Sequence, residues 1–253
     1  PSPRPRGERA ERPGRAHAVS ERIFVFDLET VRNALPWTPK PGREDALPPA
    51  PCWDIVCIGG LLLDLDPAGV KASLRIVSGA GPAEWVARVN LLAERATLVS
   101  FNGRGFDAPV IEATALRLNV PIPTLMSKRF RGRYDAGHQD VADYLSNHGA
   151  VGMVSQDLWC QSIGLPGKGA VCGADVAGLV AAGRTAEVRD YCLADVLQLG
   201  VLTLDAWRMA GALPVALIDE AERAVWKAAR ELPALEWVWT CQRAAKYLET
   251  VAQ

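Results

Sequence analysis

The sequence predicts an α/β domain in which helices cover both faces of a mixed β-sheet. The first half of the chain reads as three strands, a helix, a short strand and a second helix, and the second half is mostly helical. That order is typical of one sheet packed between helices. A length of 253 residues and a hydrophobic content of 49% provide enough apolar surface for a large core.

Residue patterns locate the elements of the first half. Residues 1–20 are rich in Arg, Pro and Ala without periodicity, which predicts a disordered leader. Strands are expected at 23–28, 55–63 and 73–78, with a proline-rich loop after the first. A proline at a helix start and apolar residues at helical spacing predict a helix at 82–95. A strand at 97–100 and a helix from 106 or 107 to 118 follow.

The second half supplies the remaining helices. They are expected at 140–146, 155–163, 175–182 and 185–209, which places one α/β domain at 21–210. Residues 211–253 carry Trp226, Trp237 and Trp239 among apolar residues and predict a helical C-terminal extension. We expect this extension to pack on the domain; a homodimer contact or support of a substrate is the alternative.

Composition and charge exclude several classes of protein. No apolar run is long enough to span a membrane and the N-terminus has no signal-like segment, so we expect a cytoplasmic protein without a membrane partner. A net charge of −1 predicts no general affinity for nucleic acid. Basic residues cluster at 4–15 and at 128–133. The first cluster is expected to be a solvated tail and the second a solvated surface, with a contact to nucleic acid as the alternative for each. Six scattered cysteines predict buried free thiols rather than disulfides or structural zinc.

Two carboxylates follow the first apolar run. Asp27 and Glu29 are two positions apart, so in a strand they share one face. Like charges there repel and lose hydration, which favours either a compensating cation or a protonated carboxyl group. A divalent cation held by oxygen ligands is the simplest compensation.

Three later residues extend this pair, although each has a plainer interpretation. Asp107 lies between a strand end and a helix start, where capping the helix would explain it. Tyr191 and Asp195 are four positions apart on an expected helix and therefore share one face, which also describes an ordinary surface pair.

The order of these residues resembles the DEDD exonuclease superfamily in its tyrosine-type subclass. Its three motifs appear as Asp27-Leu28-Glu29, Asn102 to Asp107, and Tyr191 to Asp195. The runs Asn102 to Ile111, His138-Gln139-Asp140, Ile163 to Lys168 and Tyr191 to Val196 are similar to those of predicted 3′–5′ exonucleases resembling the proofreading domain of B-family DNA polymerases. The resemblance spans residues 22 to 208 and implies an RNase H-like fold.

The resemblance also implies a mechanism with two divalent cations, Mg²⁺ or Mn²⁺. Such cations, about 3.5 to 4 Å apart, stabilise the attacking and leaving oxygens of phosphodiester hydrolysis. Asp27 is implied to bridge both ions, Glu29 and Asp195 to bind the ion that activates water, and Asp107 to hold the other. Tyr191 is implied to position the attacking water.

Six residues are expected to bind the substrate: Leu28, Thr30, Asn102, Phe106, His138 and Lys168. Phe106 is suited to stacking on a terminal base, with a core role as the alternative. Asn102 is suited to bonding the substrate or to shaping a turn, and Lys168 to a phosphate contact or a plain turn. His138 and Asp140 match a family run, although Asp140 also suits a helix cap.

The function expected from these observations is removal of nucleoside 5′-monophosphates from the 3′ ends of single-stranded nucleic acid. DNA is favoured over RNA as the substrate. Proofreading in trans, DNA repair and RNA turnover are all open as roles. An RNase H-like endonuclease is an alternative enzyme, but those families lack the helix motif from Tyr191 to Asp195. An inactive nucleic-acid-binding module is the alternative outside the enzymes.

Overall fold

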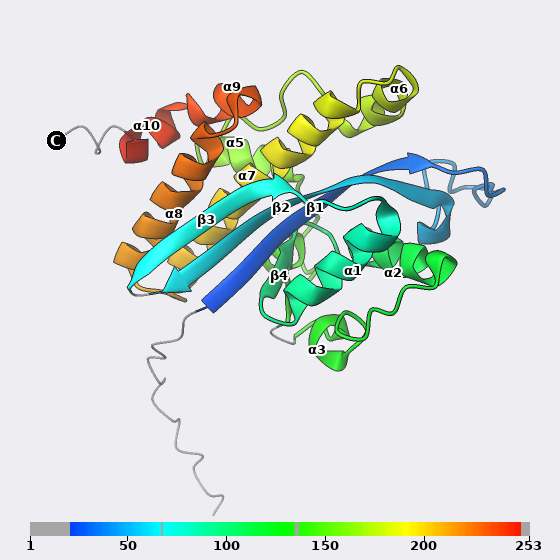
Figure 1. Cartoon of the computed structure of the whole chain (residues 1–253), viewed down its shortest axis with the longest axis horizontal. Coiled ribbons are helices and arrows are strands. Elements are labelled where there is room, and N and C mark those ends of the chain that lie inside the picture. The colour runs from blue at the N-terminus through cyan, green and yellow to red at the C-terminus, as the bar shows by residue number, and fades with distance from the viewer. Residues whose placement is uncertain (1–20, 67, 135–136, 249–253) are drawn as a thin grey trace, which may run out of the picture.

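A five-stranded sheet in the order β3-β2-β1-β4-β5 forms the centre of the protein (Figure 1). The computed structural model describes residues 21–66, 68–134 and 137–248, except for the side chains of residues 128 and 129. The strands are β1 Glu21–Arg32, β2 Trp53–Asp66, β3 Gly69–Ile76, β4 Thr97–Ser100 and β5 His138–Asp140. The first three are antiparallel, whereas β4 and β5 run parallel to β1. This is the RNase H-like mixed sheet that the sequence predicted.

Helices cover both faces of this sheet, as expected (Figure 1). The longer ones are α1 Pro82–Ala93, α2 Asp107–Leu118, α7 Thr185–Ala210 and α8 Val215–Arg230. The shorter ones are α3 Lys128–Arg131, α4 Val141–Leu145, α5 Gln156–Ser162, α6 Val176–Ala181, α9 Glu236–Trp239 and α10 Gln242–Leu248. Three 3₁₀ turns lie at Ala50–Cys52, Gly173–Asp175 and Pro233–Leu235.

Alternation along β1 divides the core into two layers. Phe24, Phe26 and Leu28 face α1 and α2, whereas Ile23 and Val25 face α7 and α8. Side chains two positions apart in a strand share a face. The row that begins with Ile23 and Val25 therefore continues into the two carboxylates of β1 and aims them at α7.

The carboxylate pair lies inside β1 rather than after its end, because the strand continues to Arg32. Its hydrogen bonds to β4 nevertheless stop at Val25, and only β2 accompanies it further. Beyond Val25 the chain of β4 turns away and leaves one side of β1 open. A crevice at the carboxyl ends of diverging strands is a common position for a functional site in open α/β sheets.

Two adjacent glycines on β2 allow close packing on both faces of the sheet. A methyl group on Gly60 would lie 2.4 Å from the Phe24 ring, and one on Gly59 would lie 2.8 Å from Cys192 Sγ and 3.0 Å from Val196 on α7. Atoms cannot approach so closely without displacement. Glycine at position 59 therefore lets α7 lie directly against β2.

The C-terminal helices pack on the domain, as the sequence predicted. Helix α8 packs against β3, and its Trp226 is fully buried in the same core as the strands. Arg243 of α10 links three helices, because its guanidinium binds Asp205 of α7 at 2.6 Å and the fully buried Glu222 of α8 at 2.6 Å. The core is therefore continuous across residue 210.

Two further expected elements differ from the structure: the third strand lies at Gly69–Ile76 rather than 73–78, and the helix expected at 140–146 is preceded by a strand. The predicted helix at 140–146 begins only at Val141, because residues 138–140 form β5. Asp140 ends this strand and caps α4, since its carboxylate accepts a hydrogen bond from the Asp143 amide. Three residues are too few for an alternating pattern to reveal a strand.

Several other expectations concern the surface. The predicted leader lies outside the described residues. Arg131 and Arg133 of the basic cluster form ion pairs with Glu112 and Asp143.

All six cysteines are free, and four of them are buried, which confirms the prediction of buried free thiols. Within the described parts of the chain, no helix combines the length and apolar character needed to cross a bilayer.

Candidate active site

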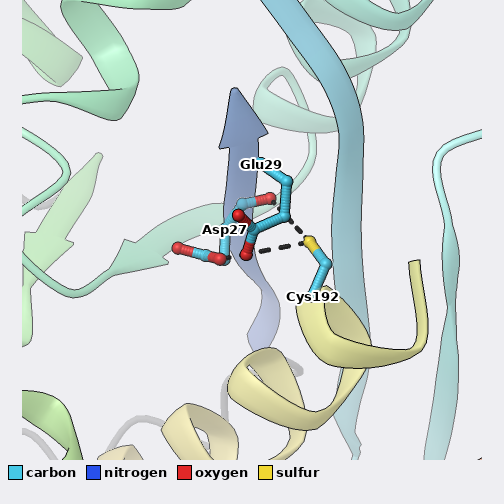
Figure 2. A group of neighbouring side chains, drawn as sticks. All are labelled: Asp27, Glu29 and Cys192. Atoms are coloured by element: carbon cyan, nitrogen blue, oxygen red, sulfur yellow. Dashed lines mark hydrogen bonds between the residues drawn. The ribbon is translucent and has the colours of Figure 1, made fainter. Parts of the chain in front are cut away.

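Asp27 and Glu29 of β1 meet Cys192 of α7 on the face of the sheet that α7 covers (Figure 2). One potential ligand atom from each of the three residues lies within 4.8 Å of the others. The Cys192 thiol donates to the backbone carbonyl of Asp27 at 3.6 Å and approaches its carboxylate at 4.0 Å. The contact fixes α7 against the strand that carries the two carboxylates.

Asp107 enters this site from the first turn of α2. Its side chain is buried and accepts a hydrogen bond from the Leu28 amide, so it lies directly beside β1. The loop before it is compact: a methyl group on Gly103 would meet Ser100 Oγ at 2.2 Å and the Asp107 carboxylate at 3.2 Å. Glycine at this position therefore allows the carboxylate to approach β4.

Asp140 supports the loop that delivers Asp107. Its buried carboxylate accepts hydrogen bonds from the amides of Asn102 at 2.8 Å and Arg104 at 3.0 Å. Asn102 has a left-handed backbone, with φ of 58°, which asparagine tolerates better than most residues. The predicted helix cap and the loop support are thus two roles of the same carboxylate.

Tyr191 and Asp195 lie one turn apart on α7 and face the strand, as predicted. The Tyr191 hydroxyl is hydrogen-bonded to the Asp195 carboxylate, and the tyrosine is buried. Gln156 of α5 donates to the Asp195 carbonyl at 2.9 Å. The helix therefore presents both side chains from a supported backbone.

Burial raises the pKa of all four carboxyl groups, and the charges of other site carboxylates raise those of Asp27 and Glu29 further. Burial is the largest cause in each case, and it raises the pKa of Glu29 to about 9, of Asp107 to about 7 and of Asp195 to about 6. The pKa of Asp27 is also raised, by burial and then by the charges of Asp107, Glu29 and Asp195.

This arrangement fits divalent cations. Four carboxylates that repel one another in a buried site require positive charge when they ionise together. Their oxygens are the ligands that Mg²⁺ and Mn²⁺ prefer. The donor set on the described residues thus suits the metal chemistry that the sequence pattern implied.

Cys192 is a site residue that the sequence reasoning missed. Its hydrogen bond with Cys57 and its burial raise its pKa well above the ordinary value, so it remains a neutral thiol. Its position directly after Tyr191 and three residues before Asp195 placed it near the motif face of α7. That spacing was the available signal.

Two of the four carboxylates, those of Asp27 and Asp107, border a cleft of about 470 Å³. Three predicted substrate residues, Leu28, Asn102 and Phe106, line it together with Asp27 and Asp107. The predicted Lys168 reaches the other side of the site, where its ammonium lies 5.9 Å from the centre of the Tyr191 ring.

The proline-rich loop after β1 forms part of the wall of this cleft, which sequence reasoning did not anticipate. Leu47 and Pro48 line the cleft, and the Leu47 side chain is 71% exposed. Trp53 holds the wall in place, since its indole donates to the Pro48 carbonyl at 2.8 Å and its ring contacts Phe106 edge-on at 5.6 Å.

The other three predicted substrate residues, Lys168, His138 and Thr30, do not line this cleft. His138 on β5 is 3% exposed and shares a hydrogen bond of 2.7 Å with Ser100. Burial lowers its pKa to about 3, so its ring is neutral. Thr30 lies on β1 beyond the irregularity after Glu29 and is not among the described residues that line the cleft.

Residues 83–234 match the sequence model of a family described as "Predicted 3'-5' exonuclease related to the exonuclease domain of PolB". The match covers more than half of the chain. The chain belongs to this exonuclease family. The matched segment contains Asp107, Tyr191 and Asp195, whereas Asp27 and Glu29 precede it. The structure joins the two groups, because α7 packs directly on β1.

Solved structures similar to this PolB-related exonuclease chain share little sequence with it. The family B DNA polymerase of Pyrobaculum calidifontis is 16% identical, with a TM-score of 0.45, over 81% of this chain and 29% of the polymerase. E. coli exonuclease I in complex with a dA16 oligonucleotide is 12% identical, with a TM-score of 0.36, over 78% of this chain and 46% of that protein. The chain thus spans less than half the length of either. A search of curated protein sequences finds no match.

Proposed function

We propose that this protein is a metal-dependent 3′–5′ exonuclease that removes nucleoside 5′-monophosphates from single-stranded DNA ends. The observation that carries the proposal is the convergence of Asp27, Glu29, Asp107 and Asp195 with the Tyr191 hydroxyl beside an open cleft. Membership of a family related to the PolB exonuclease domain supports this reaction and favours DNA over RNA.

The four carboxylates would hold two divalent cations, Mg²⁺ or Mn²⁺. Bound there, the cations supply charge stabilisation to the attacking and leaving oxygens of an in-line displacement. Asp27, whose pKa responds to the other three carboxylates, would be shared between the ions. Glu29 and Asp195 would serve one ion and Asp107 the other.

Tyr191 would orient the attacking water. Its hydroxyl already bonds to Asp195, and the packing of α7 on β1 holds it beside the carboxylates. A hydroxyl fixed in this way offers one further hydrogen bond to a water molecule. Correct placement of the attacking oxygen accounts for much of the rate of such reactions.

The cleft would receive the terminal nucleotide. Its apolar walls, Leu28 and Phe106 on one side and Leu47 on the other, suit an unpaired base. The side-chain amide of Asn102 would bond the nucleotide, and Lys168 would approach a phosphate from the Tyr191 side. A strand whose last base must enter this cleft has to be unpaired at its 3′ end, as in proofreading or DNA repair.

The test is degradation of four substrates with Mn²⁺, Mg²⁺ or EDTA. Three carry a 5′ label: linear single-stranded DNA, single-stranded RNA and recessed duplex. The fourth is circular single-stranded DNA. We expect stepwise shortening of linear DNA from its 3′ end, abolished by EDTA and by Asp27→Ala but not by Asp45→Ala in the exposed loop. Hydrolysis that survives EDTA would contradict the metal mechanism, and cleavage of the circle would indicate an endonuclease. Binding without any shortening would indicate an inactive module.

A further inference from the structure

A second hollow, of about 540 Å³, lies between α1 and the strands β1 to β3. Its apolar lining comes from Phe24, Leu62, Val77, Leu91 and Leu92. Leu91 is 59% exposed, although it belongs to a helix that packs on the core. Figure 1 shows the ends of β2 and β3 extending beyond α1, which leaves this part of the sheet accessible.

Arginine side chains surround this apolar floor. They are Arg22, Arg75, Arg88 and Arg95, and Glu94 is the one carboxylate among the residues that line the hollow. Arg22 is already paired with Asp64.

The remaining three arginines have no carboxylate partner within the described part of the chain. Arg75 binds the Ser73 hydroxyl at 2.9 Å and Arg88 binds the Ser78 hydroxyl at 3.1 Å. A guanidinium group bound to a hydroxyl keeps its full charge and several free donors. The rim therefore carries three guanidinium charges that form no ion pair with the described residues.

The hollow is separate from the candidate active site. Phe24 and Asp27 lie on opposite faces of β1, because they are three positions apart. No residue that lines the hollow also lines the carboxylate cleft. The floor is mainly aliphatic, and its one aromatic ring, Phe24, is only 3% exposed, so it offers little surface on which a base could stack.

We infer that this hollow binds an acidic segment of a partner protein that carries bulky apolar side chains. The apolar side chains would enter the floor at Leu91, and neighbouring carboxylates would pair with Arg75, Arg88 and Arg95. Arginine and carboxylate groups form strong paired hydrogen bonds, and a buried apolar anchor supplies most of the affinity in many interfaces. Such a contact would attach the nuclease to another protein without occupying its cleft.

The test is fluorescence anisotropy of a labelled peptide of four aspartates followed by two leucines, with the full chain in EDTA. Matched peptides replace the leucines with serines or the aspartates with asparagines. Arg88→Glu combined with Arg95→Glu should weaken binding at least about tenfold, as expected for two lost charged pairs. Lys227→Glu with Arg230→Glu, on the exposed side of α8, makes the same charge change as a control and should leave binding intact.

The leucine peptide should also bind more tightly than the serine peptide, and Leu91→Ser should remove that difference. Absence of peptide binding, or equal losses in the two double variants, would overturn the inference. Selective loss of binding to a labelled single-stranded oligonucleotide would reassign the hollow to nucleic acid. Because binding is measured without metal, failure here is distinguishable from failure of the proposed hydrolysis, which Arg88→Glu with Arg95→Glu should leave unchanged.

Discussion

The Lys168 ammonium lies 5.9 Å from the centre of the Tyr191 ring and places a positive charge beside the carboxylates. Burial raises the pKa of Asp195 and of Glu29, and the charge of Lys168 opposes both rises. The ammonium itself is exposed and therefore available to a second anion. Its two roles, toward the carboxylates and toward a substrate phosphate, should respond differently to substitution.

Lys168→Gln should raise KM for single-stranded DNA about tenfold, as expected for one lost charged contact. The affinity for Mn²⁺ should stay equal or increase, because the substitution removes a charge that repels the cation. Steady-state kinetics and calorimetric titration of Mn²⁺ measure the two effects. Lys227→Gln on α8 is the matched control. Weaker Mn²⁺ binding without a change in KM would contradict the phosphate role.

Tyr191→Phe should lower kcat about 100-fold, within the range seen when a group that positions a proton or water is lost. Affinity for Mn²⁺ should be unchanged, since the four carboxylates remain. Single-turnover hydrolysis with saturating metal measures the chemical step. Tyr144→Phe, which removes a hydroxyl from a side chain outside the cleft, is the control. A full hydrolysis rate in Tyr191→Phe would exclude the assigned role.

The metal-free protein should become less stable as the pH rises from 7 to 9. Burial and neighbouring charges raise the pKa of Glu29 to about 9. A carboxyl group with a raised pKa holds a proton in the folded state that the unfolded state has released, so its contribution is lost as the pH rises through the folded pKa. His138, whose pKa burial lowers to about 3, is largely neutral in both states across this window.

Melting temperatures in EDTA test this expectation. Glu29→Gln should flatten the decline above pH 7 and raise the melting temperature at pH 9. Saturating Mn²⁺ should stabilise the wild-type protein more at pH 9 than at pH 7, because ionised carboxylates bind the cation. A wild-type melting temperature that rises toward pH 9 in EDTA would show that the carboxylates do not repel one another as described.

Leu47→Ser should raise KM for single-stranded DNA about fivefold, because stacking or apolar contact with one base contributes on the order of 1 kcal/mol or more. Its effect on stability should be small, since the side chain is 71% exposed. Leu116→Ser is the matched control: that leucine is 85% exposed on α2, outside the cleft. Equal KM values for the two variants would remove Leu47 from the substrate site.

Local rules predicted the residues that form the centre of the site. Strand alternation placed Asp27 and Glu29 on one face, and helical spacing did the same for Tyr191 and Asp195. Asp107 follows the β4 strand at a helix start, as its neighbours indicated. Each of these inferences needs only a few consecutive residues, and the order of the motifs supplied the relation between them.

Local sequence patterns could not predict the contacts between segments that are distant in the sequence. Leu47 faces the cleft only because Trp53 bonds to Pro48, and nothing in the composition of a proline-rich loop indicates which wall it forms. His138 matched a family run, yet burial beside Ser100 directs its ring into the core. The three-residue strand β5 has too little sequence to be recognised without its neighbour β4.

The absence of a side chain at position 59 sets the distance between α7, which carries Tyr191 and Asp195, and β1, which carries Asp27. A methyl group there would clash with Cys192 and Val196 of α7. The helix that carries Tyr191 and Asp195 would then have to move away from the strand that carries Asp27. Gly59 contributes no functional group, yet its small size sets how closely Cys192 and Val196 of α7 approach β2. Its neighbour Gly60 accommodates Phe24 on the other face, so β2 carries no side chain on either face where α7 and Phe24 pack against it.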